Sequence, residues 1–215
     1  ENDLKLIQED IKKLGFSAKI YGRKRDHKIP TKYGNVEFSN TTYELHTPSS
    51  SLAKLFFQLG YPQGNKTITP FHVPEWIRSS PLWIKRLFLS GLFGAELSSP
   101  RTHTKTGFDC PTLSMNKNRE VISSGREFAI QIMSLLEEFG INTHKLLHRE
   151  DYYNKHGKTD RLKLHISSQE DNLLKLWGKI GFSYNEKRAE LANIAILYIK
   201  EKRKLTERRT AIAEK

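Results

Sequence analysis

The stretch that decides the fold is residues 81–96, which read PLWIKRLFLSGLFGAE. A proline suits the first turn of a helix, and the residues after it are apolar on almost every side of that helix. Its small residues recur at helical spacing, Gly91 with Ala95 and Ser90 with Gly94, and such pairs let a second backbone approach closely. The sequence therefore predicts a buried helix over 81–96 that packs tightly against a partner helix.

The last residue of this helix, Glu96, stands where a carboxylate is disfavoured. The helix macrodipole places negative partial charge at the carboxyl end, which costs an anion there about 0.3–1 kcal/mol unless a cation compensates. A bound metal ion would supply that cation. The alternative is a terminal carboxylate exposed to solvent.

The rest of the chain contains two copies of one pattern. Residues 11–26 align with 136–151, residues 43–46 with 162–165, and residues 52–60 with 173–181. Each copy reads as an amphipathic helix, two alternating strands and a shorter helix. Each of these four helices is followed by a glycine that can end it: Gly15, Gly60, Gly140 and Gly181. The sequence therefore predicts an α+β fold built from two repeats.

The first repeat is expected to be incomplete. Glu1 aligns with Arg126, so residues 81–125 of the second copy have no counterpart in the first. About 45 residues are then expected before Glu1 in the natural protein. A first copy that is naturally short is the alternative. The predicted boundaries are an incomplete repeat over 1–66, a linker over 67–80, a complete repeat over 81–184 and a basic helix over 185–215.

The charge of the chain points to a polyanionic partner. The 215 residues include 36 Lys and Arg against 24 Asp and Glu, which gives a net charge of +12 and a pI near 9.7. Nucleic acid is the commonest partner of so basic a chain, because cations that neutralise phosphates release counterions. A basic surface that serves only solubility is the alternative.

The single cysteine and the hydropathy pattern indicate the cellular compartment in which the protein is expected. Cys110 alone cannot form an internal disulfide or a thiolate zinc cluster, and this fits a reducing compartment. No apolar stretch is long enough to cross a bilayer, and no secretion signal opens the chain. We expect a cytoplasmic protein that is not secreted and has no membrane partner.

Residues 88–96, FLSGLFGAE, resemble the nonapeptide of the LAGLIDADG homing endonucleases, which include members embedded in inteins and encoded in introns. The segments 60–66 and 73–77 are similar to the stretch before the second motif of such proteins. The resemblance implies a saddle of two four-stranded antiparallel sheets that binds double-stranded DNA. It also implies that Glu96 binds Mg²⁺ or Mn²⁺ and acts in phosphodiester cleavage, as a nuclease and hydrolase.

Two departures from the motif matter. Gly94 stands at its earlier acidic position, and Leu97 replaces the glycine that usually follows the metal-binding acid. No first motif is present, so the chain supplies half of the expected metal site. The alternative is therefore a protein with a degenerate form of this fold that binds DNA or RNA without cleaving it, as a maturase or regulator.

The polar faces of the predicted strands supply candidate contacts to nucleic acid. Alternate residues of a strand share a face, so donors and cations gather on one side of each sheet. In the saddle that the resemblance implies, these faces lie against DNA. An ordinary solvated sheet face is the alternative. The candidates are Lys19, Tyr21, Arg23, Arg25, Thr112, Ser114, Asn116, Asn118, Arg161, Lys163 and His165.

Two lysines complete the predicted catalytic set. Lys66 and Lys187 follow the last helix of each repeat at matching places. The resemblance implies a role beside the metal, where a cation stabilises the charged phosphorane or polarises water. Exposed lysines without a role are the alternative. A complete chain would be a monomer with pseudo-twofold symmetry, and a chain without the first motif would pair with a second copy or another chain.

Overall fold

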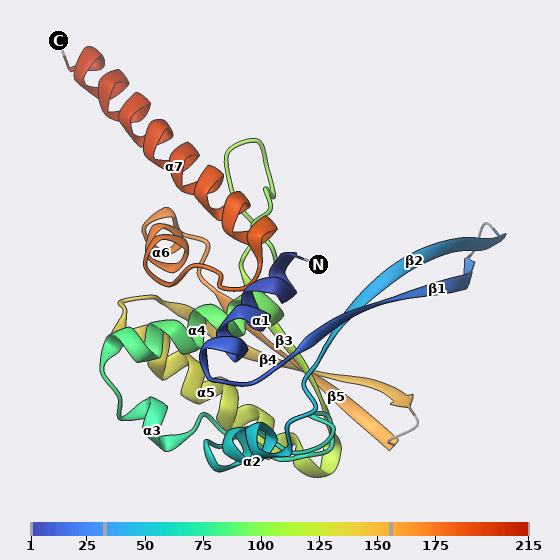
Figure 1. Ribbon diagram of the computed structural model, residues 1–215. Coiled ribbons are helices and arrows are strands. Elements are labelled where there is room, and N and C mark those ends of the chain that lie inside the picture. Colours follow the sequence, from blue (N-terminus) through green and yellow to red (C-terminus); the bar gives the residue numbers. More distant parts are fainter. Residues whose placement is uncertain (1, 32–33, 155–156, 215) are drawn as a thin grey trace. The chain divides into compact units, whose positions relative to one another are not determined.

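The computed structural model describes residues 2–31, 34–154 and 157–214 (Figure 1). The chain forms two compact units, residues 1–56 and 57–215. Helices and antiparallel sheets occur in both, so the fold class is α+β. The tandem repeat, the saddle and the four predicted boundaries stay predictions.

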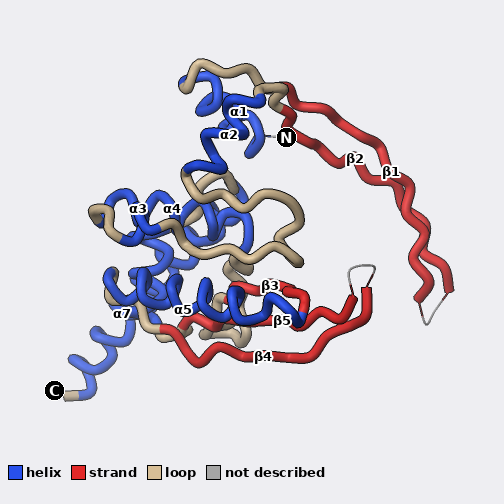
Figure 2. The backbone as a smooth tube through the Cα atoms, turned by 90° about the horizontal axis from the view of Figure 1, so that it is seen from below, coloured by secondary structure: helices blue, strands red, loops and turns tan. Residues whose placement is uncertain are grey.

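The first unit is a helix, a long hairpin and a second helix. Its elements are α1 (Asn2–Lys13), β1 (Lys19–Thr31), β2 (Gly34–His46) and α2 (Ser50–Gln58), whose last two residues belong to the second unit. The two strands pair antiparallel along their whole length, from Lys19 opposite His46 to Thr31 opposite Gly34. Figure 2 shows them as a two-stranded ribbon.

The second unit is a three-stranded sheet with helices. Its strands are β3 (Thr112–Asn118), β4 (Thr143–Asn154) and β5 (Gly157–Ile166), in the order β3-β5-β4 with both pairs antiparallel (Figure 2). Its helices are α3 (Glu75–Arg78), α4 (Leu82–Glu96), α5 (Ile122–Glu138), α6 (Glu170–Lys175) and α7 (Glu186–Ala213). A 3₁₀ turn (Arg119–Val121) precedes α5, and a π-helical turn (Leu176–Ile180) follows α6.

The core of the second unit lies between one face of the sheet and the helices. Leu162, Leu164 and Ile166 alternate along β5 and are at most 1% exposed, so this face of the strand is fully covered. Helix α5 contacts all three strands and buries Ile132 and Leu136. One face of the sheet is therefore fixed by apolar burial, which leaves the opposite face to polar residues.

Glycines end the helices as the sequence predicts. Gly15, Gly60, Gly140 and Gly181 all have positive φ, at 83°, 94°, 67° and 72°. This is the left-handed region that glycine enters without steric cost. The prediction of glycine stops is confirmed at all four positions.

Helix α4 is less buried than the sequence predicts. Pro81 precedes its first residue, and Leu89 and Phe93 are fully buried in the core. Leu82 and Trp83, however, are 50% and 62% exposed. The prediction of a buried helix therefore holds only for the side of α4 that faces the core.

The close backbone contact of α4 is made by a loop. Ser183, in the segment between the π-helical turn and α7, donates its backbone N–H to the Ser90 carbonyl oxygen at 3.0 Å, and the two hydroxyl oxygens lie 2.7 Å apart. A Cβ built on Gly94 would lie 1.8 Å from the Ser183 carbonyl oxygen, whereas one on Gly91 would meet nothing within 4 Å. The predicted partner helix is therefore wrong at Gly94, where the neighbour is a loop.

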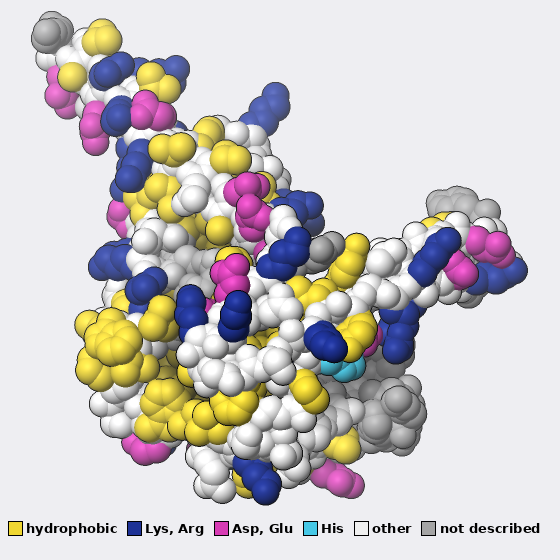
Figure 3. Space-filling view, in the orientation of Figure 1, with side chains coloured by type: hydrophobic (Ala, Val, Ile, Leu, Met, Phe, Trp, Pro, Cys, Tyr) yellow, Lys and Arg dark blue, Asp and Glu magenta, His cyan; other side chains and the backbone are white. Residues whose placement is uncertain are grey.

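Helix α7 occupies the predicted basic helix at the end of the chain. Only Ala192, Ala195 and Ile199 are buried along it, at the spacing of one narrow helical face. Figure 3 shows charged side chains of both signs along its exposed length. In the described part of the chain, no helix has both the length and the apolar character needed to cross a membrane.

Candidate nucleic-acid interface

The sheet of the second unit brings six of the predicted side chains onto one face. In its register Thr112 lies opposite His165, Ser114 opposite Lys163, and Asn116 opposite Arg161. Directly paired residues of an antiparallel ladder share a face, so these side chains are neighbours. Strand β4 adds two residues that the sequence did not single out, since Lys163 and Arg161 also pair with Leu147 and Arg149. We call this set the polar sheet face: Thr112, Ser114, Asn116, Leu147, Arg149, Arg161, Lys163 and His165.

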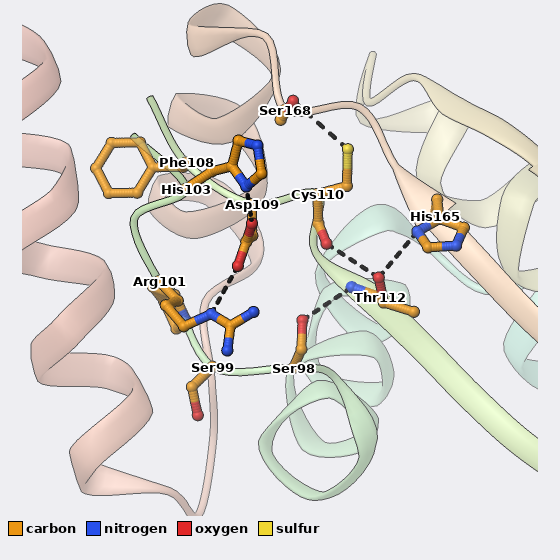
Figure 4. Close-up of a pocket in the computed structure, with 11 residues that line it drawn as sticks. Ser98, Ser99, Arg101, His103, Phe108, Asp109, Cys110, Thr112, His165 and Ser168 are labelled. Carbon is orange, nitrogen blue, oxygen red and sulfur yellow. Dashed lines mark hydrogen bonds and ion pairs between the residues drawn. The ribbon is translucent and has the colours of Figure 1, made fainter. Parts of the chain in front are cut away.

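Hydrogen bonds across the strands order part of this face. Arg161 Nε donates to Asn116 Oδ1 at 3.1 Å. Thr112 Oγ1 donates its single proton to the Cys110 carbonyl oxygen at 3.0 Å, and His165 Nδ1 lies 3.0 Å from the same hydroxyl oxygen (Figure 4). The hydroxyl has no second proton, so His165 Nδ1 is the donor in that bond. In the neutral ring Nε2 is then an acceptor.

The electrostatic setting keeps His165 neutral near pH 7. Burial lowers the pKa of His165 below its ordinary value, and the nearby Lys163 and His144 lower it further. A neutral ring with a fixed Nδ1–H presents a hydrogen-bond acceptor among the cations of the face. The polar sheet face therefore combines positive charges with donors and one acceptor.

A buried carboxylate fixes β5 beneath this face. Asp160 is 2% exposed and accepts hydrogen bonds from His148 Nε2 at 2.8 Å and Arg119 Nη2 at 3.2 Å. Burial by itself raises the pKa of Asp160, but the hydrogen bonds from His148 and Arg119 outweigh it, and the pKa lies below its ordinary value. The ionised carboxylate ties β4 and the turn before α5 to β5.

Asn118, another predicted contact, has a local role. Its side-chain oxygen accepts the backbone N–H of Glu120 at 2.9 Å and so caps the 3₁₀ turn. Its neighbour across the ladder, Thr159, is buried. We therefore leave Asn118 out of the polar sheet face.

The four predicted residues of the first unit share one face of the β1–β2 hairpin. Lys19, Tyr21, Arg23 and Arg25 alternate along β1 and are all exposed. The Arg25 guanidinium lies 2.8 Å from a carboxylate oxygen of Glu44 on β2. The side-chain hydrogen bond with His46, together with Arg23 and Arg25, holds the pKa of Glu44 below its ordinary value. This face is basic, with one carboxylate among its cations.

Glu96 has one of the two predicted lysines as its partner. Lys66 Nζ lies 2.9 Å from Glu96 Oε1, and the Glu96 side chain is 39% exposed. Lys187 is exposed in the first turn of α7. Among the residues that the structure describes, no three His, Cys, Asp or Glu side chains gather as a metal site would require. Divalent-metal binding by Glu96 stays a prediction.

The sequence missed the cation that compensates the end of α4. Arg188 Nη1 donates to the carbonyl oxygens of Gly94 at 2.6 Å and Phe93 at 3.1 Å, and Asn185 Nδ2 donates to Gly94 at 2.9 Å. The Gly94 carbonyl, which a helix leaves without a backbone partner at its end, is satisfied in this way, and the Arg188 cation opposes the helix dipole. The pairing depends on the loop before α7, which no local sequence pattern reveals.

A second missed residue is a lysine inside the core. Lys117 is 1% exposed, its Nζ donates to the carbonyl oxygens of Lys66 at 2.6 Å and Thr69 at 2.8 Å, and it lies 3.8 Å from the centre of the Phe71 ring. Burial, with a smaller effect from Lys66, lowers the pKa of Lys117 to about 8. The alternation along β3 could have revealed that Lys117 is buried, because Lys117 shares a face of the strand with the apolar residues Leu113 and Met115. Lys117 anchors the segment that carries Lys66.

Two pockets flank the polar sheet face. One, of about 230 Å³, is lined by Glu96, Lys66 and Lys117 and reaches Ser114 and Asn116. The other, of about 730 Å³, reaches Thr112 and His165 and is shown in Figure 4. In this pocket the Asp109 carboxylate lies 2.6 Å from Arg101 Nε and 3.0 Å from His103 Nδ1. The smaller hollow runs along β3 and the larger one lies at the start of this strand, so both border the edge of the polar sheet face that β3 forms.

Comparison with known proteins gives relatives for nearly the whole chain, while no family model matches it. A tRNA-splicing ligase RtcB from Methanopyrus kandleri is 38% identical over 98% of the chain, and one from Pyrococcus furiosus is 33% identical over 99%. The chain spans 21% of the length of each. The DNA-directed RNA polymerase subunit Rpo1N of Methanocaldococcus jannaschii is 31% identical over 94% of the chain, which covers 15% of that subunit.

These relatives contradict the identification of the chain as a LAGLIDADG homing endonuclease. Their names are those of an RNA ligase and an RNA polymerase subunit, with no nuclease or other hydrolase among the three. The main predicted function, metal-dependent cleavage of double-stranded DNA, and duplex DNA as the main partner are contradicted with it. A ligase named for tRNA splicing acts on RNA, which favours the RNA-binding alternative.

Proposed function

We propose that the chain is an RNA-binding segment of a larger protein and that the polar sheet face is its RNA contact. The observation that carries the proposal is the register of that face. Arg149, Arg161 and Asn116 lie side by side across three strands, and Lys163 lies between Ser114 and Leu147. Cations and donors therefore form one continuous surface on the side of the sheet that the core leaves open.

The chemistry of this face suits RNA. The arginine and lysine side chains of the face can neutralise phosphates, and the net charge of +12 favours binding of a polyanion. Ser114 and Asn116 can bond to base edges, and neutral His165 can accept a hydrogen bond from a 2′-hydroxyl group, which DNA lacks. The larger pocket, beside Thr112 and His165, leaves room for bases that are not stacked in a helix.

We assign binding, not ligation, to this segment. The similar stretch in an RNA polymerase subunit is nearly as long as that in the ligases, although the two names denote different reactions. A property common to both is contact with nucleic acid, which supports a binding role for the shared segment. We also propose a cytoplasmic location, with which the single cysteine of these 215 residues agrees.

The first test removes one cation from the face. We expect Lys163→Ala to weaken binding of a transfer-RNA transcript about fivefold to tenfold, because one phosphate contact is lost. The slope of log affinity against log salt should also become shallower by about 0.7–0.9. Fluorescence anisotropy of a labelled transcript at several salt concentrations measures both quantities.

The matched control is Lys179→Ala, which removes an equally charged, exposed lysine from the π-helical turn outside the sheet. It should leave both affinity and salt slope nearly unchanged. Equal losses in the two variants would mean that net charge alone drives binding, and the assignment to the polar sheet face would be wrong.

A further inference from the structure

The β1–β2 hairpin carries a second surface that the proposed function does not use. None of the described side chains of 19–29 and 34–46 is buried. A two-stranded ribbon of this kind gains little stability from a core of its own. Both of its faces are accessible to a partner, and their composition indicates which partner.

One face ends in an exposed aromatic and aliphatic cluster. In the register of the hairpin, His27 lies opposite Phe38 and Ile29 opposite Val36. The rings of His27 and Phe38 stack with their centres 4.9 Å apart and their planes 21° from parallel. Phe38, Ile29 and Val36 are 46%, 47% and 48% exposed. We call these four residues the hairpin aromatic patch.

The same face carries a row of cations. Lys19, Arg23 and Arg25 alternate along β1 on the side of the hairpin aromatic patch, with Glu44 as the carboxylate beside them. At about 3.3 Å per residue, the row from Lys19 to Ile29 is about 33 Å long. Figure 3 shows Lys and Arg side chains along the hairpin. A ligand that fits this row is a flexible polyanion with apolar faces.

We propose that this face of the hairpin binds unpaired nucleotides of the RNA, with a base stacked on the His27–Phe38 pair and phosphates farther along the RNA strand on Arg23 and Lys19. The inference rests on the proposed function and adds a second contact, specific for single-stranded segments. Arg25 exchanges its ion pair with Glu44 for a phosphate when the RNA binds.

The chemistry of the patch selects unpaired bases. A base in a duplex is stacked on both sides, so an aromatic ring reaches it only where the strand is open. Stacking is tolerant of sequence because every base has a π-face, and exposed arginines add cation–π contacts. The charge of the row argues against an apolar protein partner, because an apolar surface would remove water from Lys19 and Arg23 without supplying a counterion, and would bury the Arg25–Glu44 ion pair.

The test compares three substitutions of Phe38 in the full chain. Phe38→Ala and Phe38→Leu should each weaken binding of a 12-nucleotide single-stranded RNA about tenfold, since both remove the ring. Phe38→Tyr keeps the ring and should retain the wild-type affinity. Ser39→Ala is the matched control, because Ser39 lies next in β2 and points to the opposite face.

A blunt RNA duplex of the same length separates stacking from charge. All four variants should bind it as the wild type does, because it offers no open base. If Phe38→Leu binds the single strand as tightly as the wild type, stacking is not the interaction and the proposal is overturned. It is also overturned if the wild type is a dimer by native mass spectrometry and Phe38→Ala is a monomer, because the patch is then covered by a second copy.

The two proposals fail in different ways. If the wild type binds the transfer-RNA transcript with a loss in Lys163→Ala but no loss in Phe38→Ala on the single strand, the polar sheet face stands and the hairpin contact is rejected. If no RNA binds at all, both fail. A photocrosslink from 4-thiouridine in the single strand to the peptide containing Phe38 would support the hairpin contact independently of affinity.

Discussion

Gly94→Ala is expected to lower the free energy of unfolding of the second unit by about 3 kcal/mol or more. A Cβ at this position would lie 1.8 Å from the carbonyl oxygen of Ser183 and 3.0 Å from its carbonyl carbon. Both are backbone atoms, so no side-chain rotation relieves the overlap, and overpacking of this kind costs 1–3 kcal/mol even where side chains can move. The loop must shift away from α4 and lose its hydrogen bond to Ser90.

Gly91→Ala is the matched control for this prediction. It adds the same methyl group to the same helix three residues earlier, where nothing lies within 4 Å. Alanine is favoured over glycine inside a helix by about 1 kcal/mol, so this variant should be as stable as the wild type or slightly more stable. Urea unfolding followed by circular dichroism measures both. Similar stabilities for the two variants would show that α4 and the loop are not in contact as described.

The second large effect concerns the buried Lys117, whose pKa of about 8 makes stability depend on pH. In the unfolded chain a lysine titrates near 10.4, so between pH 8 and 10.4 the unfolded state binds more protons than the folded state. Stability contributed by this site therefore rises as the pH rises through that window. Below pH 8 the ammonium is charged in both states, and its burial is a constant cost.

Lys117→Met removes this titration while keeping most of the side-chain volume. The stability of the wild type relative to Lys117→Met should increase by roughly 2 kcal/mol between pH 7.5 and 9.5, at about 1.4 kcal/mol per pKa unit. Urea unfolding of both proteins across that range gives the difference. Lys179→Met, at an exposed position, should show no such trend. A constant difference between the wild type and Lys117→Met would mean that Lys117 titrates normally.

Much of the candidate site follows from the period of a strand. Thr112, Ser114 and Asn116 were predicted to share a face because alternate residues do, and the same rule groups Arg161, Lys163 and His165. Arg149 could not be placed in this way. Strand β4 has register shifts between Thr143 and Leu146 and between Glu150 and Tyr153, which break the simple alternation along the chain.

Other parts of the site depend on contacts between distant segments. Arg188 reaches the end of α4 only because the loop containing Ser183 lies against Ser90 and Gly94. The buried Lys117 is stabilised by carbonyls about fifty positions earlier in the chain, at Lys66 and Thr69. Periodicity reports which way a side chain points along its own element, and it does not report what another element brings there.

The family resemblance shows the same limit for a short motif. Leu89 and Phe93 are fully buried in the core, and Gly94 is required by its contact with Ser183. Packing in this fold therefore accounts for these three residues of the nonapeptide without a metal ion. Nine residues of one helix, with the two short segments 60–66 and 73–77 before it, were too few to establish an activity for the whole chain.

Binding of RNA at the polar sheet face can be measured in a single competition experiment. A labelled transfer-RNA transcript bound to the chain would be challenged with unlabelled RNA or with duplex DNA of equal phosphate count, for the wild type and for the double variant Arg161→Ala/Lys163→Ala. If the polar sheet face binds RNA, unlabelled RNA should compete at least tenfold better than duplex DNA, and the double variant should bind the transcript about thirtyfold more weakly. Duplex DNA competing as well as RNA or better, or unchanged binding by the double variant, would contradict it.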